Sequence, residues 1–303
     1  MNRSIKALTA SAYLSMFFLG IANALIGAAA RNIGLTPFQI GLFLTVQNIG
    51  FMIGVSVAGA LADSYDKPRI LFAGSLILAV SFFTFYLTGL LWLNLIIMLL
   101  IGLGVGSYEG VTDPMLLEMH DERQSLHINI NHFFVTFGSI LMTIYLIYLQ
   151  MNWRRSLTEA AVAVLVLAAF FALARLKSEP SQADYLDRLR VLSRERLVVV
   201  LFVATLLVVG VELGTTGIVT TYLMELQGFT QETSKIGLLT FLVGMASGRL
   251  IIGFLVRSDQ AVRYILLLFG LATVFFGLMV TLQLREWSYV TIFLAGLAMS
   301  ALV

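Results

Sequence analysis

The sequence predicts an all-α polytopic membrane protein, from its composition, the length of its apolar runs and the spacing of its polar turns. Of its 303 residues, 59% are hydrophobic and 12% are charged, and the mean hydropathy is +0.94. A soluble domain carries about 25% charged residues. Apolar runs of about 20 residues recur along the chain, and a helix satisfies its own backbone hydrogen bonds. We therefore expect helices that cross a lipid bilayer.

The composition also argues against several classes of function. The chain has no cysteine, which excludes disulfides, thiol catalysis and cysteine-ligated metals. Its three histidines, His120, His127 and His132, are too few and too badly spaced for a metal site. The net charge of +2 does not suggest a nucleic-acid partner. No phosphate-binding glycine loop or nucleophile–base signature is present, so we expect no enzyme, no cofactor and no metal.

Six spans are predicted in the first part of the chain. Between Ile70 and Tyr108 there is no charged residue. A helix of that length would be about twice the thickness of a bilayer, so the chain must fold back near Thr88 and Gly89. The six spans are Ala7–Ala30, Phe38–Ala62, Ile70–Thr88, Trp92–Met115, Leu126–Gln150 and Leu157–Leu176.

The longest polar stretch, Lys177 to Arg196, separates these spans from the rest. We interpret residues 178–196 as a cytoplasmic linker, with an amphipathic helix near Tyr185–Leu192. Residues 1–177 would form a six-helix bundle and residues 197–303 an incomplete second bundle of about four helices. The second set of spans is Leu197–Leu223, Thr233–Val256, Val262–Leu284 and a tenth that starts near Trp287.

The distribution of basic residues predicts the orientation. With a cytoplasmic amino terminus, the inner segments hold most of the lysines and arginines, including those of the linker. Cytoplasmic loops of membrane proteins carry such an excess. We therefore expect the amino terminus to lie in the cytoplasm.

The second and eighth spans resemble each other, which suggests an internal repeat. Parallel repeats are a transporter architecture, with the substrate site between the two halves. Ile40-Gly41-Leu42 matches Ile236-Gly237-Leu238, and the glycines at 54 and 59 match those at 248 and 253 after a small shift in register.

The stretch Gly59–Arg69 resembles the loop motif of the major facilitator superfamily, G-x-L-A-D-R-x-G-R-R. Gly59, Leu61, Ala62 and Asp63 match, Lys67 and Arg69 keep the basic character, and Ser64, Asp66 and Pro68 depart from it. The Trp153-Arg154 pair before the sixth span is a further feature associated with that superfamily. The resemblance implies the major facilitator fold, with two six-helix halves. It also implies that this chain is truncated after about ten spans and lacks about two helices.

Three segments resemble the fucose-permease-like sugar transporters: Glu109-Gly110, Asn131-His132-Phe133-Phe134 and Gly210-Val211-Glu212. That resemblance implies proton-coupled transport and a functional carboxylate in the fourth span. The fucose permease also uses a carboxylate in its first span, where this sequence offers only Asn23.

Three acids are the candidates for proton coupling. Glu109 lies within an apolar helix, where an ionised side chain costs about 2.5–3.5 kcal/mol on insertion scales. Asp113 is four residues further and shares its helix face. Glu212 lies in the middle of the seventh span. Each could instead be held in a structural ion pair or hydrogen bond, and the same alternative applies to His132.

Neutral polar residues are the candidates for substrate binding, since amides both donate and accept hydrogen bonds. They could equally connect helices to each other. The candidates are Asn23, Gln47, Asn48, Asn131 and Thr216.

Four charged residues are predicted to take part in gating. The superfamily resemblance implies that Asp63 helps to hold the two halves in the outward-facing state, and Lys67 and Arg69 belong to the same loop. Arg249 is the corresponding charge of the second half.

The sequence thus predicts a secondary active transporter of the inner or plasma membrane that works by alternating access. A small polar organic solute, with sugar favoured, would move together with protons. Two alternatives stay open at this point: proton-driven efflux of lipophilic compounds, and a non-transporting membrane receptor or scaffold. The expected partners are the substrate, protons and the lipid bilayer.

Overall fold

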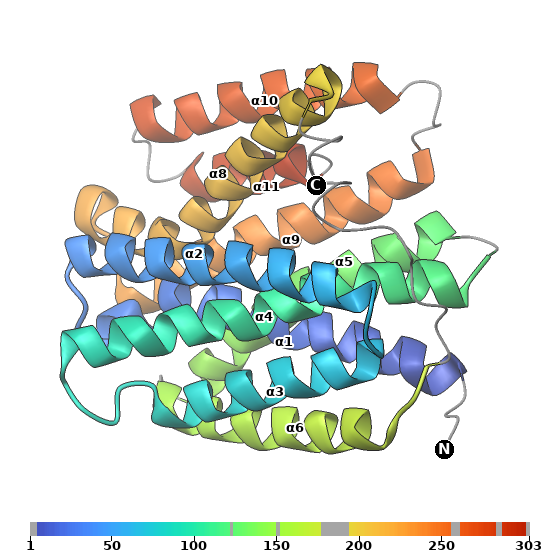
Figure 1. Ribbon diagram of the computed structural model, residues 1–303. Helices are drawn as coiled ribbons and strands as arrows, with labels where there is room; N and C mark the ends of the chain where they lie inside the picture. Colours follow the sequence, from blue (N-terminus) through green and yellow to red (C-terminus); the bar gives the residue numbers. More distant parts are fainter. Residues whose placement is uncertain are drawn as a thin grey trace.

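The computed structural model describes residues 5–121, 124–149, 152–176, 194–255, 261–282 and 287–300. Within these ranges the chain forms ten helices (Figure 1). They are α1 (Ile5–Ile33), α2 (Pro37–Ala62), α3 (Lys67–Thr84), α4 (Leu91–Met119), α5 (Gln124–Tyr148), α6 (Trp153–Leu173), α8 (Arg196–Gln227), α9 (Gln231–Leu255), α10 (Ala261–Leu282) and α11 (Ser288–Met299).

Each predicted span corresponds to one of these helices, and their boundaries differ by a few residues. One of the four-residue differences is at α3, which ends at Thr84 instead of Thr88. Tyr86 adopts a left-handed backbone conformation with φ 56°, which a helix cannot accommodate. The buried Asn94 side chain then fixes the loop by accepting from Tyr86 N and donating to Thr88 O. Most of the predicted linker, with its amphipathic helix, lies outside the described residues.

Six of the described helices are long and apolar enough to cross a membrane. They are α1 to α4, the part of α5 from Leu126, and α6. The start of α2 at Pro37 is fixed by a reciprocal capping box between Thr36, the N-cap residue, and Gln39 in the first turn.

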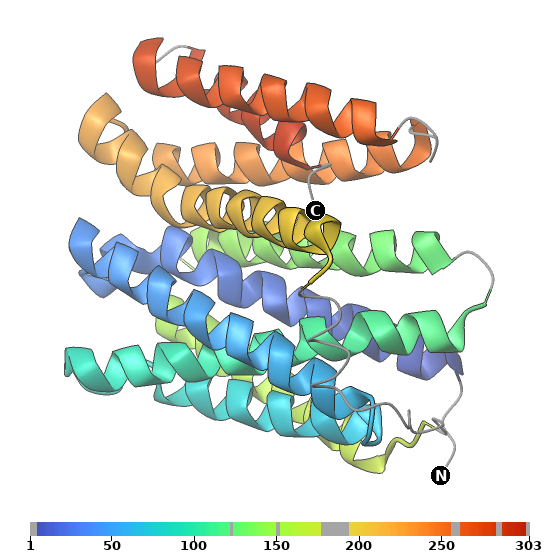
Figure 2. The ribbon, with the colours of Figure 1, turned by 45° about the horizontal axis from the view of Figure 1, so that its top comes forward.

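The six helices α1 to α6 form one bundle, and α8 to α11 lie on one side of it (Figure 2). Within the bundle α2 packs on α4, α1 on α5, and α3 on both α4 and α6. Helix α1 is the most buried of these six, since 78% of an 18-residue apolar segment within it is buried inside the molecule. The two groups of helices meet mainly where α1 contacts α8 and where α5 contacts α9.

Glycines on α4 permit the close contact with α2. A Cβ added at Gly102 would lie 2.1 Å from the Gln47 carbonyl oxygen, and one at Gly106 would lie 2.4 Å from that of Phe51. The stripe of small residues on the fourth span therefore serves helix packing. It also sets the position of Glu109 relative to α2.

Gly102→Ala is expected to lower the stability of the fold, because the added methyl group meets backbone atoms that cannot move independently. Overpacking of this kind costs about 1–3 kcal/mol. Thermal melting in detergent would measure the loss. Gly41→Ala is the matched control, since an added Cβ there meets nothing within 4 Å. Equal melting temperatures for the two variants would contradict this view of the α2–α4 contact.

Candidate functional site

A cavity of about 440 Å³ lies between the six-helix bundle and the helices that follow it. Its wall is apolar over much of its area, with contributions from Leu19, Phe51 and Met52. Helices α1, α2, α4, α5, α8 and α9 all contribute to the lining. The polar lining residues are Asn23, Asn48, Ser56, Glu109, His132, Glu212 and Arg249.

His132 lies between two carboxylates of α4. Its Nδ1 atom is 4.0 Å from Glu109 Oε1, and its Nε2 atom is 3.2 Å from Asp113 Oδ2. All three side chains are about three-quarters buried, with exposed fractions of 25%, 22% and 25% for Glu109, His132 and Asp113. Glu109 and Asp113 are one helical turn apart, which gives one carboxylate to each ring nitrogen.

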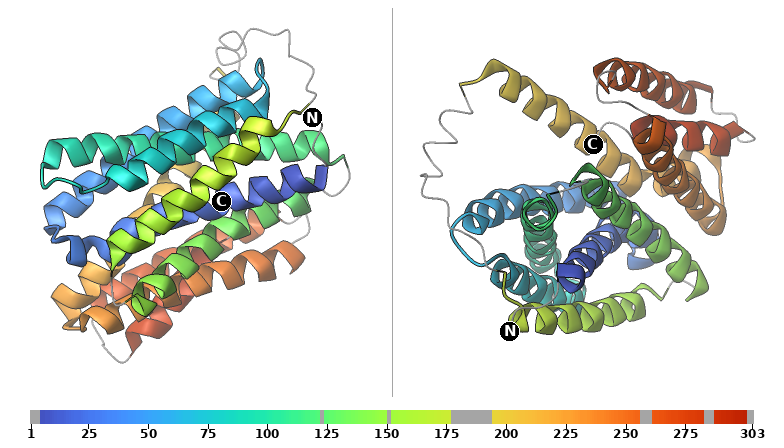
Figure 3. Two further views of the ribbon diagram at one scale, coloured as in Figure 1. Left: turned by 90° about the horizontal axis from the view of Figure 1, so that it is seen from below. Right: turned by 90° about the vertical axis from the view of Figure 1, so that its right-hand side faces the viewer.

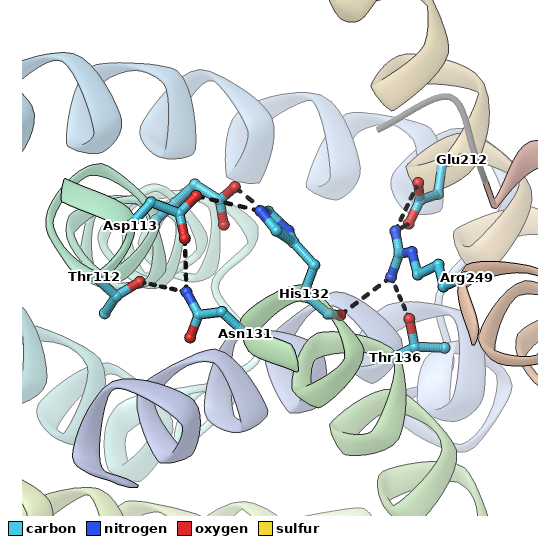
Figure 4. Close-up of polar contacts among 8 residues, drawn as sticks. Thr112, Asp113, Asn131, His132, Thr136, Glu212 and Arg249 are labelled. Atoms are coloured by element: carbon cyan, nitrogen blue, oxygen red, sulfur yellow. Dashed lines mark hydrogen bonds and ion pairs between the residues drawn. The ribbon is translucent and has the colours of Figure 1, made fainter. Parts of the chain in front are cut away.

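Asn131 holds Asp113 in place from the neighbouring helix. Its Nδ2 atom donates to Asp113 Oδ1 at 2.7 Å and to Thr112 Oγ1 at 3.0 Å (Figure 4). Asn131 itself is fully buried. Asp113 is thereby bonded to α5 through both Asn131 and His132.

Arg249 connects the helices on both sides of the cavity. Its Nη2 atom lies 3.2 Å from Glu212 Oε1 on α8. Its Nη1 atom donates to the backbone oxygen of His132 at 3.3 Å and to Thr136 Oγ1, both on α5 (Figure 4). The Arg249 and Glu212 side chains are 11% and 14% exposed, so this ion pair is largely shielded from solvent.

Glu109, Asp113 and His132 offer ligand atoms within 4.8 Å of one another. Glu109 faces one ring nitrogen and Asp113 faces the other. The three side chains are therefore close enough together to share a proton or to hold a metal ion.

Several predicted site residues lie elsewhere. Gln47 is buried between α1 and α2 and donates to Ala22 O at 3.4 Å. Thr216 is buried and donates to Glu212 O. Together with Asn131 these residues make contacts between or within helices, and they are absent from the cavity lining. Asn23 and Asn48 do line it.

The loop after α2 makes contacts within the six-helix bundle. Lys67 Nζ pairs with Glu118 Oε2 on α4 at 2.7 Å, and Arg69 lies 3.8 Å from Asp66. Asp66 also accepts from the backbone nitrogen of Leu176, beyond the end of α6. Asp63 is partly buried at the C-cap of α2.

A set of hydrogen bonds, here called the closing layer, joins the last turns of α1 to α8 and α9. Thr220 Oγ1 on α8 donates to Gly27 O at 2.6 Å. Asn32 Oδ1 accepts from Gln231 Nε2 at 2.6 Å and from Lys235 Nζ at 3.1 Å. We did not anticipate this layer from the sequence. The basic residue Lys235 just inside a span was its one visible sign.

The other two histidines form a separate cluster where α4 ends and α5 begins. Their rings stack with centroids 3.7 Å apart. His120 Nε2 contacts Thr9 Oγ1 at 2.8 Å, and His127 Nδ1 contacts Tyr13 Oη at 2.6 Å. Burial, and then the nearby His127, hold the pKa of His120 below its usual value of 6.5.

This cluster predicts a loss of stability in mild acid. Because the pKa of folded His120 is depressed, the unfolded chain takes up the proton first as the pH falls. Stability is therefore full above about pH 6.5 and declines below it. The melting temperature should fall between pH 7.5 and 5.5, and less so in His120→Asn. An identical fall of the melting temperature in His120→Asn would show that groups other than His120 cause the loss of stability.

Comparison with known proteins gives matches to a protein family, to individual relatives and to solved structures. A family model described as "Major Facilitator Superfamily" matches residues 8–303. An uncharacterized membrane protein of Saccharomyces cerevisiae is 26% identical over 188 residues, or 58% of this chain and 42% of the relative. A putative metabolite transport protein of Bacillus subtilis is 27% identical over 218 residues, or 64% and 45% of the two chains. The chain thus matches less than half the length of either relative.

Solved structures share the fold at low sequence identity. A D-xylose–proton symporter has a TM-score of 0.67 at 14% identity, with 98% of this chain and 81% of that one covered. The Escherichia coli fucose:proton symporter has a TM-score of 0.68 at 18% identity, with 99% and 82% covered. A nucleoside transporter has a TM-score of 0.73 at 12% identity, with 98% and 80% covered. The resemblance in architecture extends over nearly the whole chain.

Proposed function

Since this chain belongs to the major facilitator superfamily, we propose that it moves a small polar organic solute, with sugar favoured, together with protons. The family and the fold point to an integral membrane transporter and not to an enzyme. Alternating access between the two groups of helices would carry the solute.

One observation carries the proposal: the cavity between the two groups of helices is lined by Glu109, His132, Glu212 and Arg249. Ionisable residues are expensive inside a membrane, so a group of them around a cavity indicates a path for substrate or ions. Arg249 contacts both α8 and α5. A change in the charge of these four residues would therefore alter the contact between the six-helix bundle and the helices that follow it.

Sugar is favoured as the substrate for two reasons. Asn23, Asn48 and Ser56 on α1 and α2 line the cavity and supply neutral donors and acceptors for hydroxyl groups. The fold is also that of fucose and xylose proton symporters, which makes these two sugars the first to test.

Efflux of lipophilic compounds is the second candidate. Phe51, Met52 and Leu213 are among the apolar residues that line the cavity. An apolar wall with a few charged groups suits a lipophilic cation as well as a sugar.

We further propose an inward-facing state with a cytoplasmic amino terminus. The closing layer at Gly27 and Asn32 would then lie at the outer face. Helix α8 approaches the bundle near its Gln227 end and diverges from it toward Arg196 (Figures 1 and 3). The divergent end would face the cytoplasm.

Uptake into proteoliposomes tests the proposal. The full-length protein would be reconstituted and supplied with labelled L-fucose or D-xylose, with and without an inward proton gradient. We expect uptake of at least one sugar, increased by the gradient. No uptake of either sugar, combined with export of a lipophilic cation, would favour efflux.

Asn32→Asp is expected to slow transport by strengthening the closing layer. Lys235 is 2% exposed, and a carboxylate in place of the amide would form a shielded ion pair with it. Initial rates of sugar exchange would measure the effect, with Asn152→Asp at the N-cap of α6 as the control. Unchanged exchange in Asn32→Asp would show that this contact does not limit opening.

A further inference from the structure

We propose that His132 relays protons between Glu109 and Asp113, so that these three side chains act as one proton-carrying unit. The inference rests on the proposed proton coupling and assigns to it a residue and a path. It starts from one feature of the geometry: the two carboxylates contact different nitrogens of the same ring.

The ring is placed to exchange protons on both sides. Nε2 is 3.2 Å from Asp113 Oδ2, which is a hydrogen-bonding distance. Nδ1 is 4.0 Å from Glu109 Oε1, and the two atoms must approach to about 2.6–3.2 Å for a proton to pass between them. A histidine with a purely structural role needs only its bond to Asp113. The second carboxylate and the 22% exposure of His132 beside the cavity go beyond that need.

The three side chains form a path that begins at the cavity. Glu109 and His132 line the cavity, where substrate would enter. Asp113 is one turn closer to the end of α4, where Glu118 pairs with Lys67. The path thus leads from the cavity toward the loop between α2 and α3.

The residues around His132 keep its ring and the Asp113 carboxylate in position. Asn131 donates to Asp113 and keeps it beside the ring. Among the described residues, the titratable and charged groups around His132 are Glu109 and Asp113 on α4, Arg249 on α9 and Glu212 on α8. Since Arg249 donates to the backbone oxygen of His132, the relay is also attached to the helices across the cavity.

The transfer balances as two proton steps. A protonated Asp113 carboxyl gives its proton to Nε2 of a ring that already carries hydrogen on Nδ1, which leaves an aspartate and an imidazolium. The imidazolium then gives the Nδ1 proton to the Glu109 carboxylate. One proton has moved from Asp113 to Glu109, and the ring is left with its hydrogen on Nε2, which is the tautomer from which the reverse sequence starts. The reverse sequence discharges Glu109.

Nitrogen-15 NMR of protein labelled at histidine tests the relay without any substrate. The chain has three histidines, and His132→Gln identifies the signals of His132 by their loss. We expect the pH at which these signals change to shift by about one unit or more in Glu109→Gln and also in Asp113→Asn. Glu159→Gln, an exposed acid on α6, is the matched control and should leave it unchanged. A response to Asp113→Asn alone would reduce His132 to a structural partner and overturn the proposal.

Transport measurements separate the relay from the proposed function. In His132→Gln, accumulation of L-fucose or D-xylose driven by a proton gradient should fall about tenfold or more relative to sugar exchange without a gradient. His127→Gln, a histidine outside the cavity, is the control. Gradient-driven accumulation that survives in His132→Gln with an unchanged pH profile would overturn the relay while leaving symport intact. If the unaltered protein accumulates neither sugar, the proposed function fails for these sugars and the NMR titration still decides the relay.

Discussion

Glu109→Gln is expected to reduce sugar accumulation driven by a proton gradient to the level of protein-free liposomes. Glutamine keeps the size and hydrogen-bonding capacity of the side chain but cannot bind and release a proton. Glu109 lines the cavity and faces His132 Nδ1, so it is the carboxylate that substrate and proton would meet together. Exchange of sugar at equal pH, which needs no net proton movement, should be affected far less.

The measurement compares accumulation and exchange in the same proteoliposome preparation across a range of pH. Glu159→Gln serves as the control, because Glu159 is 42% exposed and pairs with Arg155 on α6, away from the cavity. An unchanged dependence of transport on pH in Glu109→Gln would remove this residue from proton coupling.

Arg249→Gln is expected to destabilise the protein and to impair transport. The substitution leaves Glu212 charged and 14% exposed, without the guanidinium 3.2 Å away. Removing one partner of a buried ion pair lowers the free energy of unfolding by about 3–5 kcal/mol. It also removes the donors to His132 O and Thr136 that connect α9 with α5.

The double variant Arg249→Gln with Glu212→Gln separates stability from transport. Two neutral amides leave no charge without a partner, so most of the thermal stability should return. Transport should stay impaired, because the donors that connect α9 with α5 are altered. If the losses in melting temperature from the two single substitutions simply add in the double variant, Arg249 and Glu212 do not stabilise each other as the distances suggest.

The helices could be predicted from the sequence because a lipid environment demands long apolar segments. The premature end of α3 could not, since the positive φ of Tyr86 leaves no sign in the residue pattern. Likewise, the bonds from Asn94 to the Tyr86–Leu90 loop depend on the exact path of that loop.

The acids of the cavity stood out for a physical reason. Glu109 and Glu212 interrupt apolar runs, where a charge needs a function or a partner. The sequence could not predict that Arg249 is the partner of Glu212, because Arg249 lies 37 positions further along the chain, on another helix.

Neutral polar residues were harder to place than charged ones. Gln47 and Asn48 are neighbours in sequence and chemically alike. The structure directs Gln47 into the α1–α2 contact and Asn48 to the cavity. A difference of one position rotates a side chain by about 100° around a helix, and only the packing of the neighbours decides which face meets the cavity.

The coupling of sugar to protons is tested most directly by watching protons when only sugar is supplied. Proteoliposomes containing a fluorescent pH indicator would receive external L-fucose or D-xylose at equal pH on both sides. We predict acidification of the interior in step with sugar entry, and none in Glu109→Gln. Sugar entry without any acidification would contradict the account and would leave a uniporter in its place.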